Sequence, residues 1–136
     1  MKVIIRKIKH SDYLGIIDLY NEIYKKNIMY HDININNDKN IIVIEIESKI
    51  IGCIEINILN NEIENYKYSY ITNIIINSKY QSQSMLNLII QACTKISENN
   101  NCKKIILNIP NNQNYETYKK NNFKQNNNII LTKDLN

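Results

Sequence analysis

Two aliphatic strands joined by an amphipathic helix dominate the second half of the sequence. Residues 74–76 form a continuous isoleucine stretch, which is typical of a strand covered on both faces. From 84 to 98 apolar residues recur at spacings of three and four, which predicts a helix with one buried face. Residues 104–109 are again aliphatic, and Pro110 ends the run. Two strands joined by a crossover helix pair in parallel, so this stretch predicts an α/β fold.

The rest of the chain adds strands and helices around this unit. Ser11 lies where a helix N-cap is expected, ahead of apolar residues at helical spacing. Two β-branched runs separated by Ser48 and Lys49 predict a hairpin. The predicted strands are 3–8, 40–47, 50–58, 68–77 (taken as the central strand), 104–109, 123–124 and 129–132. The predicted helices are 11–24, 84–98 and 115–120, and 27–39 is a loop with room for one further helical turn. The expectation is an α/β (α+β) fold with a mixed central sheet of six to seven strands and about four helices, in the order β-α-β-β-β-α-β-α-β.

Composition narrows the class of protein. A chain of 136 residues is long enough to form one domain with its own core. The net charge of +4 comes from scattered Lys and Arg, so no nucleic-acid surface is expected. Three widely spaced cysteines fit neither a disulfide framework nor a zinc site, and they are interpreted as small core residues. No signal peptide or membrane-length apolar run is visible, which predicts a soluble, cytoplasmic protein that does not bind membranes.

A more specific pattern lies between residues 71 and 123. The strand end at 74–76 is followed by the loop Tyr80-Gln81-Ser82-Gln83-Ser84-Met85-Leu86, and the next aliphatic strand is followed by Asn111, Tyr118 and Phe123. This order resembles the GNAT superfamily of acetyl-CoA-dependent N-acetyltransferases. Members of that family show an Arg/Gln-x-x-Gly-x-Gly/Ala loop that opens a helix, and later an Asn, a catalytic Tyr and Gly-Phe. The resemblance covers the whole predicted topology and implies a single acetyltransferase domain over residues 1–136.

The resemblance also implies how acetyl-CoA is held. A helix start carries free N–H groups and partial positive charge, so it accepts a pyrophosphate. Main-chain groups of Ile74 and Ile76 would pair with the pantetheine arm where two parallel strands separate. Tyr118 would be the general acid that protonates the CoA thiolate, because the pKa of a phenol, about 10, exceeds that of a thiol. The expected cofactor-binding residues are Ile74, Ile75, Ile76, Gln81, Ser82, Gln83, Ser84, Met85, Leu86, Asn87, Asn111 and Asn114, and no metal is expected.

Two positions depart from the family pattern. Ser84 stands where the first loop glycine is usual, and Leu86 stands where the second Gly/Ala is usual. A left-handed Ser84 would cost on the order of 1 to 2 kcal/mol, whereas an ordinary first-turn residue would cost nothing. Leu86 would crowd the phosphates unless its side chain points into the core. Gln81 keeps the family pattern.

The general base is not identified by the sequence. Family members often carry a Glu near the central strand, where this chain has Tyr70-Ile71-Thr72-Asn73. Glu55 on the preceding strand and His31 in the polar loop are the alternatives, and His10 is expected to face solvent.

The functional expectation is therefore transfer of an acetyl group from acetyl-CoA to a primary amine. The acceptor is left open between a small molecule, such as an amino sugar or a polyamine, and a protein amine. The alternative is a catalytically inactive GNAT-fold protein that serves as a binding or regulatory module. A third alternative is an unrelated small α/β domain with a basic surface for nucleic acid. The resemblance also leaves a homodimer open, because GNAT-like domains often pair through their terminal strands and the C-terminus is β-rich.

Overall fold

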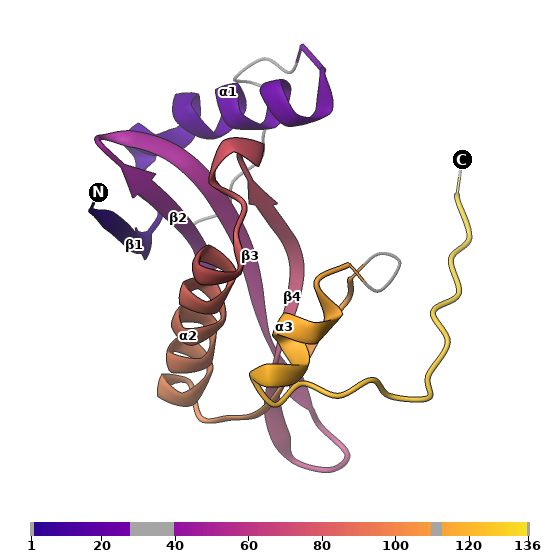
Figure 1. Ribbon diagram of the computed structural model, residues 1–136. Coiled ribbons are helices and arrows are strands. Elements are labelled where there is room, and N and C mark those ends of the chain that lie inside the picture. The colour runs from indigo at the N-terminus through magenta and orange to yellow at the C-terminus, as the bar shows by residue number, and fades with distance from the viewer. Residues whose placement is uncertain (1, 28–39, 110–112, 136) are drawn as a thin grey trace.

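The computed structural model describes residues 2–27, 40–109 and 113–135 (Figure 1). The strands are β1 (Val3–Lys7), β2 (Asn40–Ile46), β3 (Lys49–Asn61), β4 (Tyr66–Ile76) and β5 (Cys102–Leu107). The helices are α1 (Tyr13–Tyr24), α2 (Gln83–Asn99) and α3 (Tyr115–Lys120), with 3₁₀ turns η1 (His10–Asp12) and η3 (Ser78–Tyr80). No helix in these three ranges is long and apolar enough to cross a membrane.

The five strands form one mixed sheet in the order β1-β2-β3-β4-β5. The first four strands pair antiparallel, as the predicted hairpin requires. β4 and β5 pair in parallel, with α2 as the crossover between them. The predicted parallel unit is therefore confirmed. The strand expected at the centre, β4, lies between β3 and β5 and is therefore second from the edge, whereas the middle strand of the five is β3.

The sheet has fewer strands than the sequence predicts. The described residues contain five strands and three α-helices, instead of six to seven strands and about four helices. The expected strands at 123–124 and 129–132 do not form within this chain, because residues 124–135 are exposed and pair with no neighbouring strand. β-Branched composition favours a strand only where a partner strand is available to complete the ladder.

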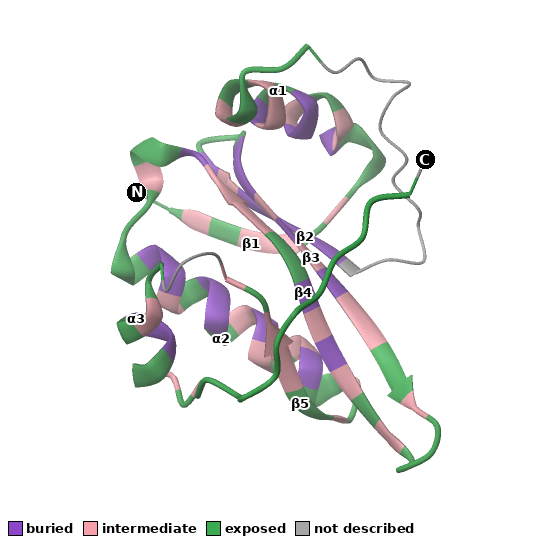
Figure 2. Ribbon diagram, turned by 90° about the vertical axis from the view of Figure 1, so that its right-hand side faces the viewer, coloured by how far each residue is buried: buried purple, intermediate pink, exposed green. Residues whose placement is uncertain are grey.

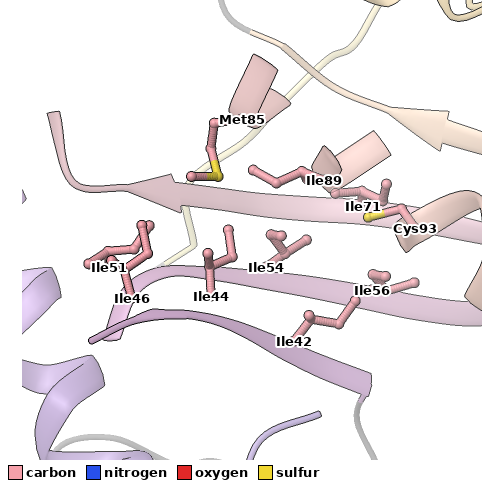
Figure 3. Close-up of a cluster of buried hydrophobic side chains, with 10 residues drawn as sticks. All are labelled: Ile42, Ile44, Ile46, Ile51, Ile54, Ile56, Ile71, Met85, Ile89 and Cys93. Atoms are coloured by element: carbon pink, nitrogen blue, oxygen red, sulfur yellow. The ribbon is translucent and has the colours of Figure 1, made fainter. Parts of the chain in front are cut away.

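Helices cover both faces of the sheet (Figure 2). One face packs against α2 and carries the main core cluster, drawn in Figure 3: Ile42, Ile44, Ile46, Ile51, Ile54, Ile56, Ile71, Met85, Ile89 and Cys93. The other face packs against α1, where Ile16 and Leu19 contact Val43 and Ile50. Successive strand residues point to opposite faces, so Val43 belongs to the α1 cluster while Ile42 and Ile44 belong to the α2 cluster.

The start of α1 differs from the expectation at Ser11. The 3₁₀ turn His10–Asp12 comes first, and the α-helix begins at Tyr13. The reason is Asp12, whose buried carboxylate accepts two hydrogen bonds from the Arg6 guanidinium at 2.7 and 2.8 Å. It also accepts the Lys9 backbone N–H at 2.7 Å. These bonds hold the turn in place and make Asp12, rather than Ser11, the anchor of the helix entry.

We expect Asp12→Ala to lower the free energy of unfolding by about 2 kcal/mol at pH 7, because it leaves Arg6 without its bidentate partner. The Arg6 hydrogen bonds hold the pKa of Asp12 below its usual range. A depressed carboxyl pKa stabilises the fold above about pH 4, and this contribution is lost as the pH falls through the folded-state pKa. Urea unfolding at pH 7 and pH 3 checks both points.

The matched control for this experiment is Asp18→Ala, since Asp18 is exposed on the same helix. Its effect should stay within about 0.5 kcal/mol at either pH. If the two variants lose the same stability, or if the deficit of Asp12→Ala does not shrink at pH 3, the Arg6–Asp12 pair does not anchor the helix entry.

Candidate functional site

The parallel strands β4 and β5 separate partway along the sheet. Their pairing ends at Ile71 opposite Leu107, whereas β4 continues to Ile76 against β3. The β3–β4 register also shifts here, because Glu55 pairs with Asn73 while Ile56 pairs with Ile71. Thr72 is therefore the extra residue of a β-bulge, a feature that bends a strand locally. The bulge and the separation occur at the same point of β4.

Beyond the bulge, alternate peptide groups of β4 face away from β3. The Asn77 N–H donates to the Ile51 carbonyl of β3 at 2.8 Å. Since peptide groups alternate in direction along a strand, those of Ile74 and Ile76 point to the opposite side, where β5 no longer runs alongside. The Gln81 side chain confirms this direction, because its Nε2 donates to the Ile76 carbonyl at 3.2 Å. An extended ligand on this side would meet main-chain donors and acceptors.

The start of α2 lies at the same end of β4. Ser82 is the N-cap, and its hydroxyl accepts the Met85 N–H at 3.1 Å. The N–H groups of Gln83 and Ser84 belong to the first turn, where an α-helix offers no carbonyl partner. These two donors, together with the helix dipole, favour a negatively charged group at this position.

Both departures from the expected loop are accommodated. Ser84 is an ordinary first-turn residue, and it is absent from the residues with positive φ. It therefore carries no left-handed strain. Leu86 is buried, and its side chain packs with Ile90 of α2 and Tyr118 of α3. Its bulk is directed toward the core.

These elements surround a cavity of about 530 Å³, a size that suits a small-molecule ligand. Eight of the residues expected from the sequence line it: Ile74, Ile76, Gln81, Ser82, Gln83, Leu86, Asn114 and Tyr118. Eight further residues complete the lining: Tyr24, Ile71, Thr72, Asn73, Leu107, Asn108, Ile109 and Gln113. The cavity thus reaches from the end of α1, through the gap between β4 and β5, to α2 and α3.

The remaining expected residues lie elsewhere. Ile75 packs into the core on the α1 face, and Met85 belongs to the main core cluster. Ser84 is exposed beside the cavity, whereas the Asn87 side chain accepts a hydrogen bond from Asn121 at 2.9 Å. Asn111 lies outside the described residues. The additional lining residues could be recognised only from their position in the sheet. Ile71 and Leu107 form the last parallel pair, and the residues next to them border the gap between β4 and β5.

Tyr118 is 5% exposed and packs its ring edge-on to Phe123, with 5.8 Å between ring centroids. Within the described part of the chain, its hydroxyl has no hydrogen-bond partner. Burial, and secondarily the negative charge that Cys93 would carry if ionised, raise the pKa of Tyr118 above its ordinary value of 10. The phenol is therefore protonated at neutral pH and borders the cavity, which are two properties of a proton donor.

The candidate bases are less well placed. The Glu55 carboxylate accepts a hydrogen bond from the Asn73 side chain at 3.2 Å, on the α1 face of the sheet. Asn73 lines the cavity, but Glu55 does not. His10 stacks against Tyr13 near the start of α1, away from the cavity. His31 lies outside the described residues.

None of the three cysteines is among the described residues that line the cavity. Cys93 is buried on the face of α2 that packs against the sheet, and burial raises its pKa to about 12. Burial and the nearby Glu55 carboxylate raise the pKa of Cys53 to about 12 as well. A thiol with such a pKa is almost entirely un-ionised at neutral pH, so it is a poor nucleophile. The interpretation of Cys93 as a core residue is confirmed, while Cys53 and Cys102 are only partly buried.

The described fold is that of known acetyltransferases. A GNAT family acetyltransferase from Staphylococcus aureus superposes with a TM-score of 0.79 at 23% identity, covering 99% of this chain and 100% of that chain. Glucosamine-6-phosphate N-acetyltransferase from Arabidopsis thaliana superposes with a TM-score of 0.82 at 20% identity, covering 100% of both chains. Ribosomal-protein-alanine N-acetyltransferase from Brucella melitensis gives a TM-score of 0.80 at 11% identity, covering 98% of this chain and 100% of that chain.

The mixed sheet with a separated parallel pair thus defines an α/β protein of the acetyltransferase fold. The family model described as "Acetyltransferase (GNAT) family" matches residues 5–123. The chain therefore belongs to the GNAT acetyltransferase family, as the loop and strand pattern predicts. No curated protein matches the sequence significantly.

Proposed function

We propose that this protein is an N-acetyltransferase, with residues 1–136 as one catalytic domain, that moves an acetyl group from acetyl-CoA to a primary amine. The observation that carries the proposal is the meeting of three features at one cavity in a GNAT family member. These features are the outward-facing peptide groups of β4, the start of α2 and the buried phenol of Tyr118.

The binding part of the proposal assigns each end of the cavity to a part of acetyl-CoA. The N–H groups of Gln83 and Ser84 would hold the pyrophosphate, since a helix start favours negative charge. The peptide groups of Ile74 and Ile76 would pair with the amides of the pantetheine arm. Gln81 now occupies the Ile76 carbonyl, so its side chain would rotate away to admit the arm. Asn114 would contact the arm from the opposite wall.

The proposed acetyl transfer needs three groups: the thioester of acetyl-CoA, main-chain N–H groups of β4 and the phenol of Tyr118. Acetyl-CoA supplies the acetyl group as a thioester. Main-chain N–H groups near Ile74 would polarise the thioester carbonyl while the amine nitrogen attacks it. The new C–N bond then forms, the C–S bond breaks, and Tyr118 gives its proton to the sulfur. The attacking nitrogen loses one proton to water or to a base, which balances the reaction.

One observation favours the second candidate, a binding or regulatory module without activity. No carboxylate or histidine is present among the described residues that line the cavity. Glu55 would have to act through Asn73 or through water, because it lies one strand away from the cavity. An enzyme of this design would depend on an amine that reaches the site already deprotonated.

The proposal covers several primary amines that could accept the acetyl group. The structural neighbours include enzymes named for glucosamine-6-phosphate, for ribosomal-protein alanine and for aminoglycosides, so the fold alone admits small molecules and proteins. We take an amino sugar as the first acceptor to test, and a polyamine and a peptide amine as the next.

The test is calorimetric titration with acetyl-CoA, followed by detection of free CoA thiol in the presence of each acceptor. We expect micromolar binding and acceptor-dependent thiol release. Binding without release from any amine would favour the inactive module. An absence of binding would contradict the enzyme and would likewise favour the inactive module.

A further inference from the structure

Asn77 lies between the end of β4 and the 3₁₀ turn η3, at the same end of the sheet as α1 (Figure 1). This residue is 6% exposed, although its side chain is polar. A buried amide is stable only where its donor and acceptor groups are hydrogen-bonded. The partners of Asn77 therefore show which elements this residue holds together.

Hydrogen bonds connect Asn77 to three elements. Its main-chain N–H donates to the Ile51 carbonyl of β3 at 2.8 Å, and its own carbonyl accepts the Tyr80 N–H at 2.9 Å. In the side chain, Oδ1 accepts the Lys79 N–H at 2.9 Å, and Nδ2 donates to the Glu22 carboxylate of α1 at 3.2 Å. Asn77 is thus bonded to the sheet, to the turn that it caps and to α1.

The turn that Asn77 caps leads into the cofactor loop, residues 81–84. Gln81 and Ser82 follow η3 directly, and both line the cavity. Tyr80 packs against the main core cluster, so the turn is held at its end by packing and at its start by the Asn77 side chain. A displacement of about 1 Å in a positioning group can cost about 100-fold in rate. The cap therefore sets where the cofactor loop stands relative to β4.

Glu22 connects the same turn to the other end of the cavity. It lies in the last turn of α1, close to Tyr24, which lines the cavity and is 46% exposed. The buried residues of α1 all precede Glu22, and Ile23 beside it is only partly buried. Core packing therefore holds mainly the first part of α1, and the bond between Glu22 and Asn77 adds a directional tie at its end.

We propose that Asn77 is a positioning residue for acetyl transfer, which holds the cofactor loop through Lys79 and the end of α1 through Glu22. The inference rests on the proposed function, in which acetyl-CoA extends from the start of α2 to Ile74 and leaves the Tyr24 end of the cavity for the amine. Asn77 is not among the described residues that line the cavity, so it acts through the elements that it holds. The Oδ1 atom thus supports acetyl-CoA binding, whereas Nδ2 supports acceptor binding.

The cofactor side is tested with Asn77→Ala, which removes the acceptor of the Lys79 N–H, and with Asn77→Asp, which keeps an oxygen in its place. We expect Asn77→Ala to raise the Kd of acetyl-CoA about tenfold, whereas Asn77→Asp should stay within about threefold of the unaltered protein. Titration calorimetry measures both values. Amide hydrogen exchange at Lys79 and Tyr80 adds a readout that needs no ligand, and it should be faster in Asn77→Ala.

The acceptor side is tested at Glu22, which is exposed, so its substitution should leave the fold intact. Glu22→Ala removes the partner of the Asn77 Nδ2 and should raise KM for the amine about fivefold, with kcat and acetyl-CoA affinity unchanged. Glu22→Gln keeps a carbonyl oxygen for this bond, so its KM should stay within about twofold of the unaltered value. The matched control is Asp18→Ala, one turn earlier on the exposed side of α1.

Three results would overturn the inference. The first is an Asn77→Ala variant with unchanged acetyl-CoA affinity and unchanged amide exchange. The second is an acceptor KM that Glu22→Ala does not alter, and the third is a Glu22→Gln variant as impaired as Glu22→Ala, which would implicate the charge instead of the bond. The Glu22 variants carry the test by themselves if Asn77→Ala does not fold. If the unaltered protein binds no acetyl-CoA, the proposed function fails, and hydrogen exchange still decides whether Asn77 holds the turn.

Discussion

Replacing Tyr118 with phenylalanine is expected to lower kcat for acetyl transfer by at least about 100-fold, the usual contribution of a positioned general acid. The substitution removes only the hydroxyl, and the ring keeps its packing with Leu86, Ile90 and Phe123. Acetyl-CoA affinity should therefore stay within about twofold. Stability should also be unchanged, because the hydroxyl has no hydrogen-bond partner in the described part of the chain.

The matched control is Tyr115→Phe, which makes the same change three residues earlier on α3 at a position that does not line the cavity. It should leave kcat within about twofold. The raised pKa of Tyr118 adds a second readout, since the loss of activity that follows its ionisation should occur at a higher pH than for an ordinary phenol. A Tyr118→Phe variant with full kcat would show that the phenol is not the proton donor. A loss of acetyl-CoA binding instead would show a structural role for the hydroxyl.

The fold was largely predictable where local pattern and burial agree. The spacing of apolar residues predicts helix 84–98, and α2 covers Gln83–Asn99. This agreement follows from the amphipathic face of α2, whose buried residues include Met85, Ile89 and Cys93. The prediction for 129–132 was wrong within the single chain, because strand formation depends on a partner that sequence pattern does not supply. Ser11 was misplaced because the burial of Asp12 by Arg6 is a tertiary contact.

The candidate site was predictable only in part. The resemblance implies cofactor-binding roles for Gln81, Ser82, Gln83 and Leu86 and a catalytic role for Tyr118, and all five residues line one cavity. Tyr24 and Asn73 were not expected there, because they come from the end of α1 and from the bulge in β4. Sequence spacing does not show that two parallel strands separate, or where a bulge turns a strand. The sequence also leaves the base open, and Glu55 lies one strand away from the cavity.

The substitution expected to act most strongly on binding is Ser84→Glu, which introduces a negative charge. It should weaken acetyl-CoA binding at least about 100-fold, because the carboxylate would stand beside the N–H groups proposed to hold the pyrophosphate. Two unit charges about 4 Å apart near a protein surface repel each other by about 4 kcal/mol, so a 100-fold loss needs only part of that repulsion. Titration calorimetry at low and high salt measures the effect, which should shrink as salt screens the charges.

The control for this variant is Ser84→Gln, which has nearly the same size and no charge. Ser84 is exposed and has ordinary helical geometry, so both side chains fit without strain and neither should unfold α2. A glutamate in the first turn in fact favours the helix, because it faces the positive end of the helix dipole. Weakened binding therefore cannot be attributed to loss of the helix. Equal affinities for the Glu and Gln variants would place the pyrophosphate away from the start of α2, whereas a loss confined to Ser84→Glu would support the proposed contact with Gln83 and Ser84.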